Sequence, residues 1–127
     1  MKLRILGNSI RLRLTQSEVA QFIETGKVEE RVEFAPNTPT LKYRLETVGD
    51  GNDVRAIFED NCLRVLVTQK AAEKWASSEQ VGIEAAQILD NERSLRILIE
   101  KDFACLTARE SEDETDAFPH PMAAESF

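Results

Sequence analysis

The sequence predicts an α+β fold made from one ββαββ unit that occurs twice. The segment 10–16, IRLRLTQ, has a counterpart 53 residues later in the segment 63–69, LRVLVTQ. In both copies, short segments of alternating apolar and polar residues lie on either side of one segment with helical spacing. A repeated unit that cannot bury its own apolar face must pack against its partner. We therefore expect an antiparallel sheet or an eight-stranded barrel-like domain with two short helices.

The first copy, residues 1–49, begins with a predicted hairpin and continues into a helix. Gly7-Asn8-Ser9 suits a tight turn between two alternating segments. Thr15 and Glu18 have the spacing of a capping box, so a helix is expected to begin there and to end at Gly26. The strands expected in this copy cover residues 2–6, 10–14, 27–34 and 41–48.

The second copy, residues 53–103, follows the turn-rich segment 49–53. Thr68 is expected to cap its helix, and Trp75 is expected to pack on the sheet between the small residues Ala72 and Ala76. Its predicted strands cover residues 54–59, 63–67, 81–89 and 95–101. The sequence does not determine how the strands of the two copies pair with one another.

The chain of 127 residues suits one domain, and its negative charge is concentrated near the end. The predicted tail, residues 109–127, contains one arginine and six carboxylates, whereas residues 1–108 have a net charge of only −2. The total net charge of −7 argues against sequence-independent binding to nucleic acid. No apolar run reaches the roughly 20 residues that span a bilayer. The sequence therefore predicts a cytoplasmic protein with no membrane segment and no signal peptide.

Both ends of the chain resemble a known family. The opening residues 2–19 read K-x-R-I-x-G-N-S-I-R-x-R-L-T-Q-S-E-V, and the closing region contains the segments 100–106, E-K-D-F-x-C-L, and 118–121, F-P-H-P. These motifs resemble a family of small uncharacterised bacterial proteins that has no assigned function. The resemblance implies a single-domain cytosolic protein and supplies no functional residues.

The polar faces of the predicted strands provide one candidate site. If the sheet closed around these faces, arginines could converge on a small anion, and neighbouring glutamates could bind Mg²⁺ beside phosphates. A barrel of this kind is similar in outline to triphosphate tunnel enzymes, but their opening Glu-x-Glu-x-Lys strand is absent here. The alternative is an ordinary solvated face with cross-strand ion pairs. The candidate anion-binding residues are Arg4, Arg11, Arg13, Arg44, Arg64 and Arg96; the candidate glutamates are Glu29, Glu33, Glu46, Glu59, Glu84 and Glu100.

Metal binding and nucleophilic catalysis have little support in the sequence. Cys62, Cys105 and His120 have zinc-binding side chains, but their spacing matches no recognised zinc pattern. No Gly-x-Ser-x-Gly motif is present, and the single histidine lies between two prolines. The sequence therefore predicts no metal site and no cofactor, and the cysteines are expected to be small buried apolar residues.

The sequence therefore predicts a non-catalytic cytosolic binding or interaction protein. Its partner would be another protein or a small anion, and unpaired sheet edges would allow a homodimer. The alternative is an enzyme that processes phosphate or polyphosphate in a basic cleft or tunnel. The acidic tail could dock on the body, with Phe118 in a groove and its acids on the basic strand faces, or it could be a short linear motif that another protein binds.

Overall fold

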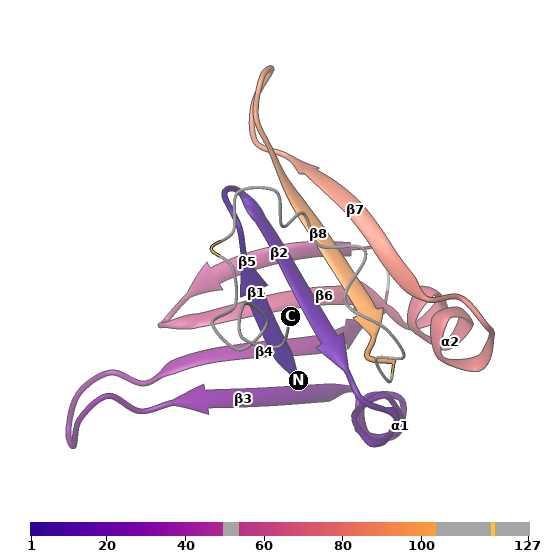
Figure 1. Ribbon diagram of the computed structural model, residues 1–127, viewed down its shortest axis with the longest axis horizontal. Helices are drawn as coiled ribbons and strands as arrows, with labels where there is room; N and C mark the ends of the chain where they lie inside the picture. Colours follow the sequence, from indigo (N-terminus) through magenta and orange to yellow (C-terminus); the bar gives the residue numbers. More distant parts are fainter. Residues whose placement is uncertain (50–53, 104–117, 119–127) are drawn as a thin grey trace, which may run out of the picture.

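The computed structural model describes residues 1–49, 54–103 and 118 (Figure 1). The described part contains eight strands and two helices in the order ββαββ–ββαββ, so the predicted α+β class and duplicated unit are confirmed. The first copy forms β1 (Lys2–Ile5), β2 (Ser9–Leu14), α1 (Gln16–Thr25), β3 (Lys27–Val32) and β4 (Leu41–Val48). The second copy forms β5 (Val54–Glu59), β6 (Cys62–Thr68), α2 (Gln69–Ser77), β7 (Gly82–Ile88) and β8 (Ser94–Lys101).

The strands form two four-stranded sheets, and each sheet takes one hairpin from each copy. One sheet has the order β1-β2-β8-β7 and the other has the order β3-β4-β6-β5. The hairpins are antiparallel, as expected, whereas the central pairs β2–β8 and β4–β6 are parallel. The two sheets cross at a steep angle and do not close into a barrel (Figure 1). Neither copy could complete a sheet without the other.

The strand registers show that the two copies are related by an approximate twofold axis. Exchanging the copies converts the order β1-β2-β8-β7 into β5-β6-β4-β3, which is the order of the other sheet. Leu12 of β2 lies opposite Ile99 of β8, and in the other sheet Val65 lies opposite Leu45. Equivalent residues are 53 positions apart in the first hairpins and the helices, 54 apart in β4 and β8, and 55 apart in β3 and β7.

Both helices begin as the sequence predicts. The Thr15 side chain accepts a hydrogen bond from the Glu18 backbone, and the Glu18 side chain binds the Thr15 backbone in return, which completes the capping box. Gly26 closes α1 with φ = 86°, a left-handed conformation that favours glycine. Thr68 caps α2 through its side chain, which accepts a hydrogen bond from the Ala71 backbone.

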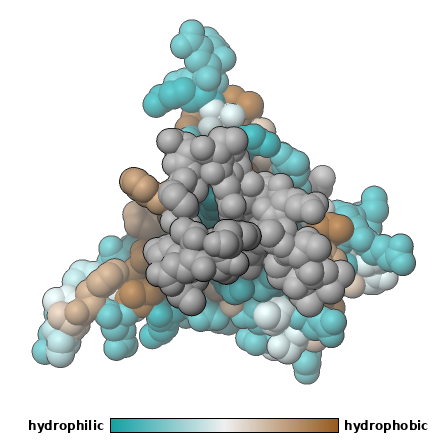
Figure 2. Space-filling model, in the orientation of Figure 1, coloured by the Kyte–Doolittle hydropathy of each residue, from teal (hydrophilic) through white to brown (hydrophobic). Residues whose placement is uncertain are grey.

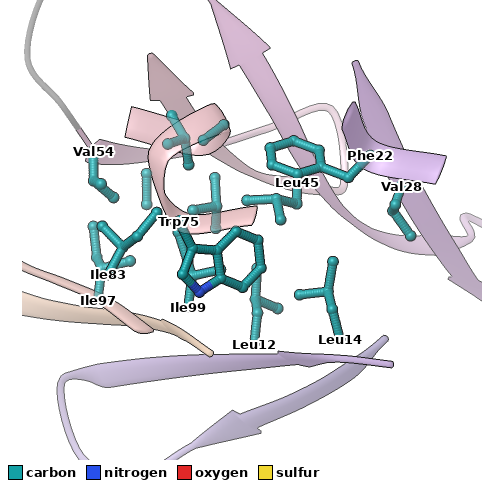
Figure 3. Close-up of a cluster of buried hydrophobic side chains, with 14 of the residues drawn as sticks. Leu12, Leu14, Phe22, Val28, Leu45, Val54, Trp75, Ile83, Ile97 and Ile99 are labelled. Atoms are coloured by element: carbon teal, nitrogen blue, oxygen red, sulfur yellow. The ribbon is translucent and has the colours of Figure 1, made fainter. Parts of the chain in front are cut away.

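The core lies between the sheets and beneath the helices, and one aromatic residue from each helix occupies its centre (Figure 3). Phe22 and Trp75 are equivalent residues, both are 0% exposed, and their rings meet edge to face with centroids 6.4 Å apart. The Trp75 indole N–H donates to the Val81 carbonyl at 3.0 Å, so its one polar atom is satisfied. The predicted packing of Trp75 on the sheets is confirmed, and the aromatic pair joins the two copies.

Several apolar side chains remain exposed toward the ends of the hairpins (Figure 2). Ile5 and its equivalent Phe58 are 65% and 68% exposed, and Phe34 and Ile88 are exposed on the other two hairpins. Phe118 is 97% exposed, so its side chain does not dock on the body as one interpretation of the sequence suggested. Neither of the described helices has the length and apolar character that crossing a membrane requires.

Candidate functional site

The arginines that the sequence singled out lie on the outer faces of the two sheets, away from the core. Arg11 and Arg13 alternate along β2 with the buried residues Leu12 and Leu14, so their side chains point outward. The six residues do not gather in one place. Arg4, Arg11, Arg13 and Arg96 belong to the sheet β1-β2-β8-β7, and Arg44 and Arg64 belong to the other sheet.

Carboxylates of the same faces pair with most of these arginines. In the first sheet, Glu100 accepts from Arg13 at 2.7 Å and lies 3.2 Å from Arg11. Arg96 donates to Glu84 at 2.8 Å on the same face. These contacts are the cross-strand ion pairs of a solvated face, and they already offset the charge that an anion would use.

The second sheet repeats this arrangement. Arg64 donates to Glu46 at 2.6 Å, and Arg44 donates to Glu29 at 2.6 Å. The hydrogen bond from Arg44 lowers the pKa of Glu29 and outweighs the opposing effect of burial, and the same contact raises the pKa of Arg44. The Glu46 hydrogen bond likewise raises the pKa of Arg64. A role for these arginines in anion binding stays a prediction. The two described sheets do not close into the barrel that the alternative hypothesis, an enzyme with a basic tunnel, would use.

A cleft of about 820 Å³ lies between α2, β5 and β7, and we call it the α2 cleft. Three cationic side chains line it: Arg55 from β5, and Lys70 and Lys74 from one face of α2. Within the described part of the chain, none of the three has an ion pair or a side-chain hydrogen bond. Only two other described cations share this property, Lys27 and Lys42, and both lie outside the cleft. Unpaired positive charge is therefore concentrated in the α2 cleft.

Apolar side chains also line the α2 cleft, together with uncharged polar side chains that are already engaged. Its apolar lining consists of Val54, Ala71, Ile83, Ala85, Ala86 and Ile88. The Gln87 amide donates to the Ala56 carbonyl at 3.0 Å and accepts from the Ala56 N–H at 2.7 Å, so it closes the gap between β7 and the edge strand β5. Glu84 is the one carboxylate among the described lining residues, and Arg96 donates to it. An entering anion would therefore meet both cationic and apolar side chains.

The equivalent place in the first copy is filled by the start of the chain. The Met1 ammonium contacts Glu18 and lies 3.3 Å from Glu30, and the Tyr43 hydroxyl donates to the Met1 carbonyl at 3.0 Å. Burial would raise the pKa of Glu18, but hydrogen bonds from the ammonium and from Thr15 outweigh it, so this pKa is lowered. Burial raises the pKa of Tyr43, and the carboxylates of Glu30 and Glu18 add to that effect. The first copy therefore holds a cation between two acids at this place.

Substitutions at equivalent positions explain how the α2 cleft differs from the matching place in the first copy. Glu18 corresponds to Ala71, and Glu30 corresponds to Ala85, so two carboxylates are replaced by methyl groups. This change removes both negative charges and most of the side-chain volume. The three cations of the α2 cleft, Arg55, Lys70 and Lys74, correspond to Lys2, Ser17 and Gln21. At the same place in the fold, the first copy therefore has charges that offset one another, and the second copy has an excess of positive charge.

None of the three cleft cations is among the anion-binding residues that the sequence predicted. Arg55 belongs to the predicted strand 54–59, and Lys70 and Lys74 lie on a helix, whereas the predicted set came from strands only. The two lysines are four residues apart, so they lie on one face of α2. A signal was available in the comparison of the copies, where Ser17 and Gln21 become lysines while Glu18 becomes alanine.

The cysteines and the histidine contribute no site in the described residues. Cys62 is a free thiol that is 7% exposed, as expected for a small buried residue. Cys105 and His120 lie outside the described residues, as does the predicted acidic segment of the tail. The parts of the chain that the structure describes contain no group of three residues able to hold a metal ion.

The fold and the cleft together define an α+β protein with internal twofold symmetry and one cationic cleft. The chain belongs to the family of unknown function DUF7009, whose model matches residues 1–122. This finding confirms the predicted membership of a family without an assigned activity. A search of curated proteins found no match. A search of solved structures found none either.

Proposed function

We propose that this protein is a non-catalytic binding protein whose α2 cleft takes a small anionic ligand. One observation carries the proposal: three of the five described cations without a side-chain partner line a single cleft. In the other copy, the same place is closed by the Met1 ammonium and two glutamates. The cleft is therefore a specific departure from the symmetry of the fold.

The electrostatics of the cleft favour a ligand with at least one acidic group. The Arg55 guanidinium can bind a carboxylate or phosphate through two parallel hydrogen bonds, and Lys70 and Lys74 add charge from the opposite wall. Charge-assisted hydrogen bonds contribute more than neutral ones because one partner carries a full charge. Partly apolar surroundings strengthen them further, because they lower the effective dielectric constant. Glu84 does not cancel this field, because its carboxylate is engaged by Arg96.

The apolar walls favour a ligand that also has an apolar portion. Val54 and Ile83 are buried, and Ala71 and Ala85 provide small surfaces against which a hydrocarbon or aromatic group could pack. The volume of about 820 Å³ lies within the range of small-molecule sites. An aryl or alkyl phosphate or carboxylate would use both kinds of surface, whereas inorganic polyphosphate would use only the cations.

Binding without catalysis is favoured by the groups that the cleft offers. Its described lining contains no cysteine or histidine, and its one carboxylate is held by Arg96. A general base must be free to accept a proton from the reacting group. Five of the six glutamates considered as magnesium ligands are similarly held by arginines; they are Glu29, Glu46, Glu59, Glu84 and Glu100.

A thermal-shift series tests the proposal. Inorganic phosphate, pyrophosphate, phenyl phosphate and a medium-chain fatty acid would be titrated against the intact chain, because a ligand that binds the folded state raises its Tm. We expect phenyl phosphate to raise the Tm more than inorganic phosphate does. Arg55→Gln and the double variant Lys70→Gln/Lys74→Gln should abolish the shift.

The matched control is Lys27→Gln/Lys42→Gln, which removes the same charge as the lysine pair but outside the cleft. It should retain the wild-type shift. The proposal is wrong if no anion raises the Tm of the wild type, or if the control loses the shift as fully as the cleft variants do. A shift abolished instead by Arg13→Gln or Arg64→Gln would favour the strand arginines.

We also retain the wider assignments that the sequence suggested. The composition supports a cytoplasmic protein with an acidic tail over residues 109–127, and the family resemblance supports a bacterial origin. The net charge of −7 supports a partner other than nucleic acid. Centrifugation at several concentrations would test the suggested homodimer, and a single monomeric species would exclude it.

A further inference from the structure

A second concave surface lies between α1 and α2, where it is lined by other residues of α2 than the α2 cleft, and we call it the interhelical groove. Its volume is about 1030 Å³. The apolar side chains that line it include Leu14, Val19, Ile23, Ala76 and Phe103. Ile23 is 40% exposed and Phe103 is 63% exposed, so large apolar groups face solvent within the groove. Exposed apolar surface in a concavity is typical of interaction sites.

The rim of the groove is acidic. Glu24 and Glu73 line it from the two helices, and neither has a cationic partner within the described part of the chain. Glu24 lies in the last turn of α1, where the helix dipole is negative and no basic residue is present. Lys101 is directed elsewhere, because its ammonium donates to the Ser78 carbonyl at 2.7 Å. A cation placed at this rim would therefore be attracted by Glu24, by Glu73 and by the end of α1.

We propose that the interhelical groove binds an amphipathic segment of a partner protein that carries apolar residues flanked by lysine or arginine. The apolar residues would cover Ile23 and Phe103, and the basic residues would meet Glu24 and Glu73. This surface is independent of the α2 cleft and of the anion that we propose for it.

Charge disfavours the other occupants of the groove. The acidic stretch of this chain, residues 110–116, contains five carboxylates and would be repelled by the rim. A second copy docked groove to groove would bring Glu24 and Glu73 of both copies together, with like charges opposed. A basic amphipathic segment is the occupant that satisfies both the apolar lining and the acidic rim.

Calorimetric titration with two synthetic helical peptides tests the proposal. One peptide is built from leucine and lysine, and the other has the same pattern with glutamate in place of lysine. We expect the wild type to bind the leucine–lysine peptide and not its acidic counterpart. The charge-reversed variant Glu24→Lys/Glu73→Lys should bind the leucine–lysine peptide about tenfold more weakly and acquire affinity for the acidic peptide.

The control variant Glu33→Lys/Glu92→Lys makes the same change in net charge at exposed positions that do not line the groove. It should bind both peptides as the wild type does, because the groove is unchanged. Phe103→Ala should weaken binding of the leucine–lysine peptide without altering the charge of the groove. The proposal fails if the wild type does not bind the basic peptide, if the control variant changes affinity as much as the charge-reversed one, or if charge reversal leaves the peptide preference unchanged.

Discussion

The two copies of the ββαββ unit are alike in their core and differ in the charged groups beside their helices. Phe22 and Trp75 occupy equivalent positions and meet at the axis, so each copy contributes one aromatic residue to the same contact. Beside the helices, the first copy holds the Met1 ammonium between Glu18 and Glu30, while the second has alanines there and three unpaired cations. Duplication therefore preserved the packing that holds the fold together, and the surface beside it was free to diverge.

The largest expected effect tests the part that the copies share. Phe22→Ala and Trp75→Ala should each lower the free energy of unfolding by about 3–5 kcal/mol, because each removes a fully buried ring and leaves a cavity. Urea titration of both variants would measure the two losses. Similar values would support equal roles in the core. A loss below about 1 kcal/mol for either variant would contradict the shared packing.

A smaller effect is expected where the copies differ. Glu18→Ala/Glu30→Ala removes both acids from the buried Met1 ammonium and should lower the free energy of unfolding by about 2–3 kcal/mol, because a buried charge loses its partners. The control is Glu33→Ala/Glu92→Ala, two exposed acids without side-chain partners in the described residues, which should change stability by less than about 0.5 kcal/mol. Equal losses in the two variants would contradict the role of the ammonium.

The pH dependence of stability sharpens the same contrast. The pKa of Glu18 is lowered in the folded state, so the unfolded state binds more protons as the pH falls below the ordinary value of 4.5. The stabilisation from Glu18 is therefore complete above that value and is lost as the pH falls through the lowered pKa. Between neutral and acidic pH, the free energy of unfolding should therefore fall less with pH for Glu18→Gln than for the wild type. Glu92→Gln, in an exposed turn, should leave the pH profile unchanged.

The smallest expected effect on stability belongs to a variant that makes the second copy resemble the first. Ala71→Glu/Ala85→Glu introduces the two acids of the first copy into the α2 cleft, where the nearby cations can pair with them. Stability should change by less than about 1 kcal/mol, because both positions are only partly buried and surface ion pairs contribute little. The thermal shift with phenyl phosphate should disappear. Retention of that shift would show that the anion binds elsewhere.

Local features of the fold were predictable because residues close in sequence determine them. The capping box of Thr15 and Glu18, the closure at Gly26 and the cap at Thr68 all follow from hydrogen bonds within a few residues. The pairing of the copies was not predictable, because β2 and β8 are neighbours in the sheet although most of the chain lies between them in the sequence. The alternation of apolar and polar residues shows which side chains of a strand share a face, but it does not show which strand is its neighbour in the sheet.

The same limit explains the outcome for the site. The sequence left open whether Arg13 and Arg64 bind an anion or form ion pairs, because their partners, Glu100 and Glu46, come from strands paired across the two copies. The cleft cations Lys70 and Lys74 looked like ordinary helix surface because the opposing wall, β7, is placed by tertiary structure. Unpaired charge can be recognised only after every ion pair has been assigned, and that assignment requires the register between the copies.

The exchange of hairpins between the sheets also has a consequence for how this chain reaches its fold. The sheet β3-β4-β6-β5 takes all four of its strands from the middle of the chain. The sheet β1-β2-β8-β7 needs a parallel pair between strands from the two ends of the chain, so it cannot form until those ends have met. Such long-range closure slows folding relative to a chain of the same size with local contacts. A cut in the segment 49–53 would convert this closure into an association between two fragments. Recovery of the fold would then depend on fragment concentration, because the covalent link no longer sets the effective concentration of one copy around the other.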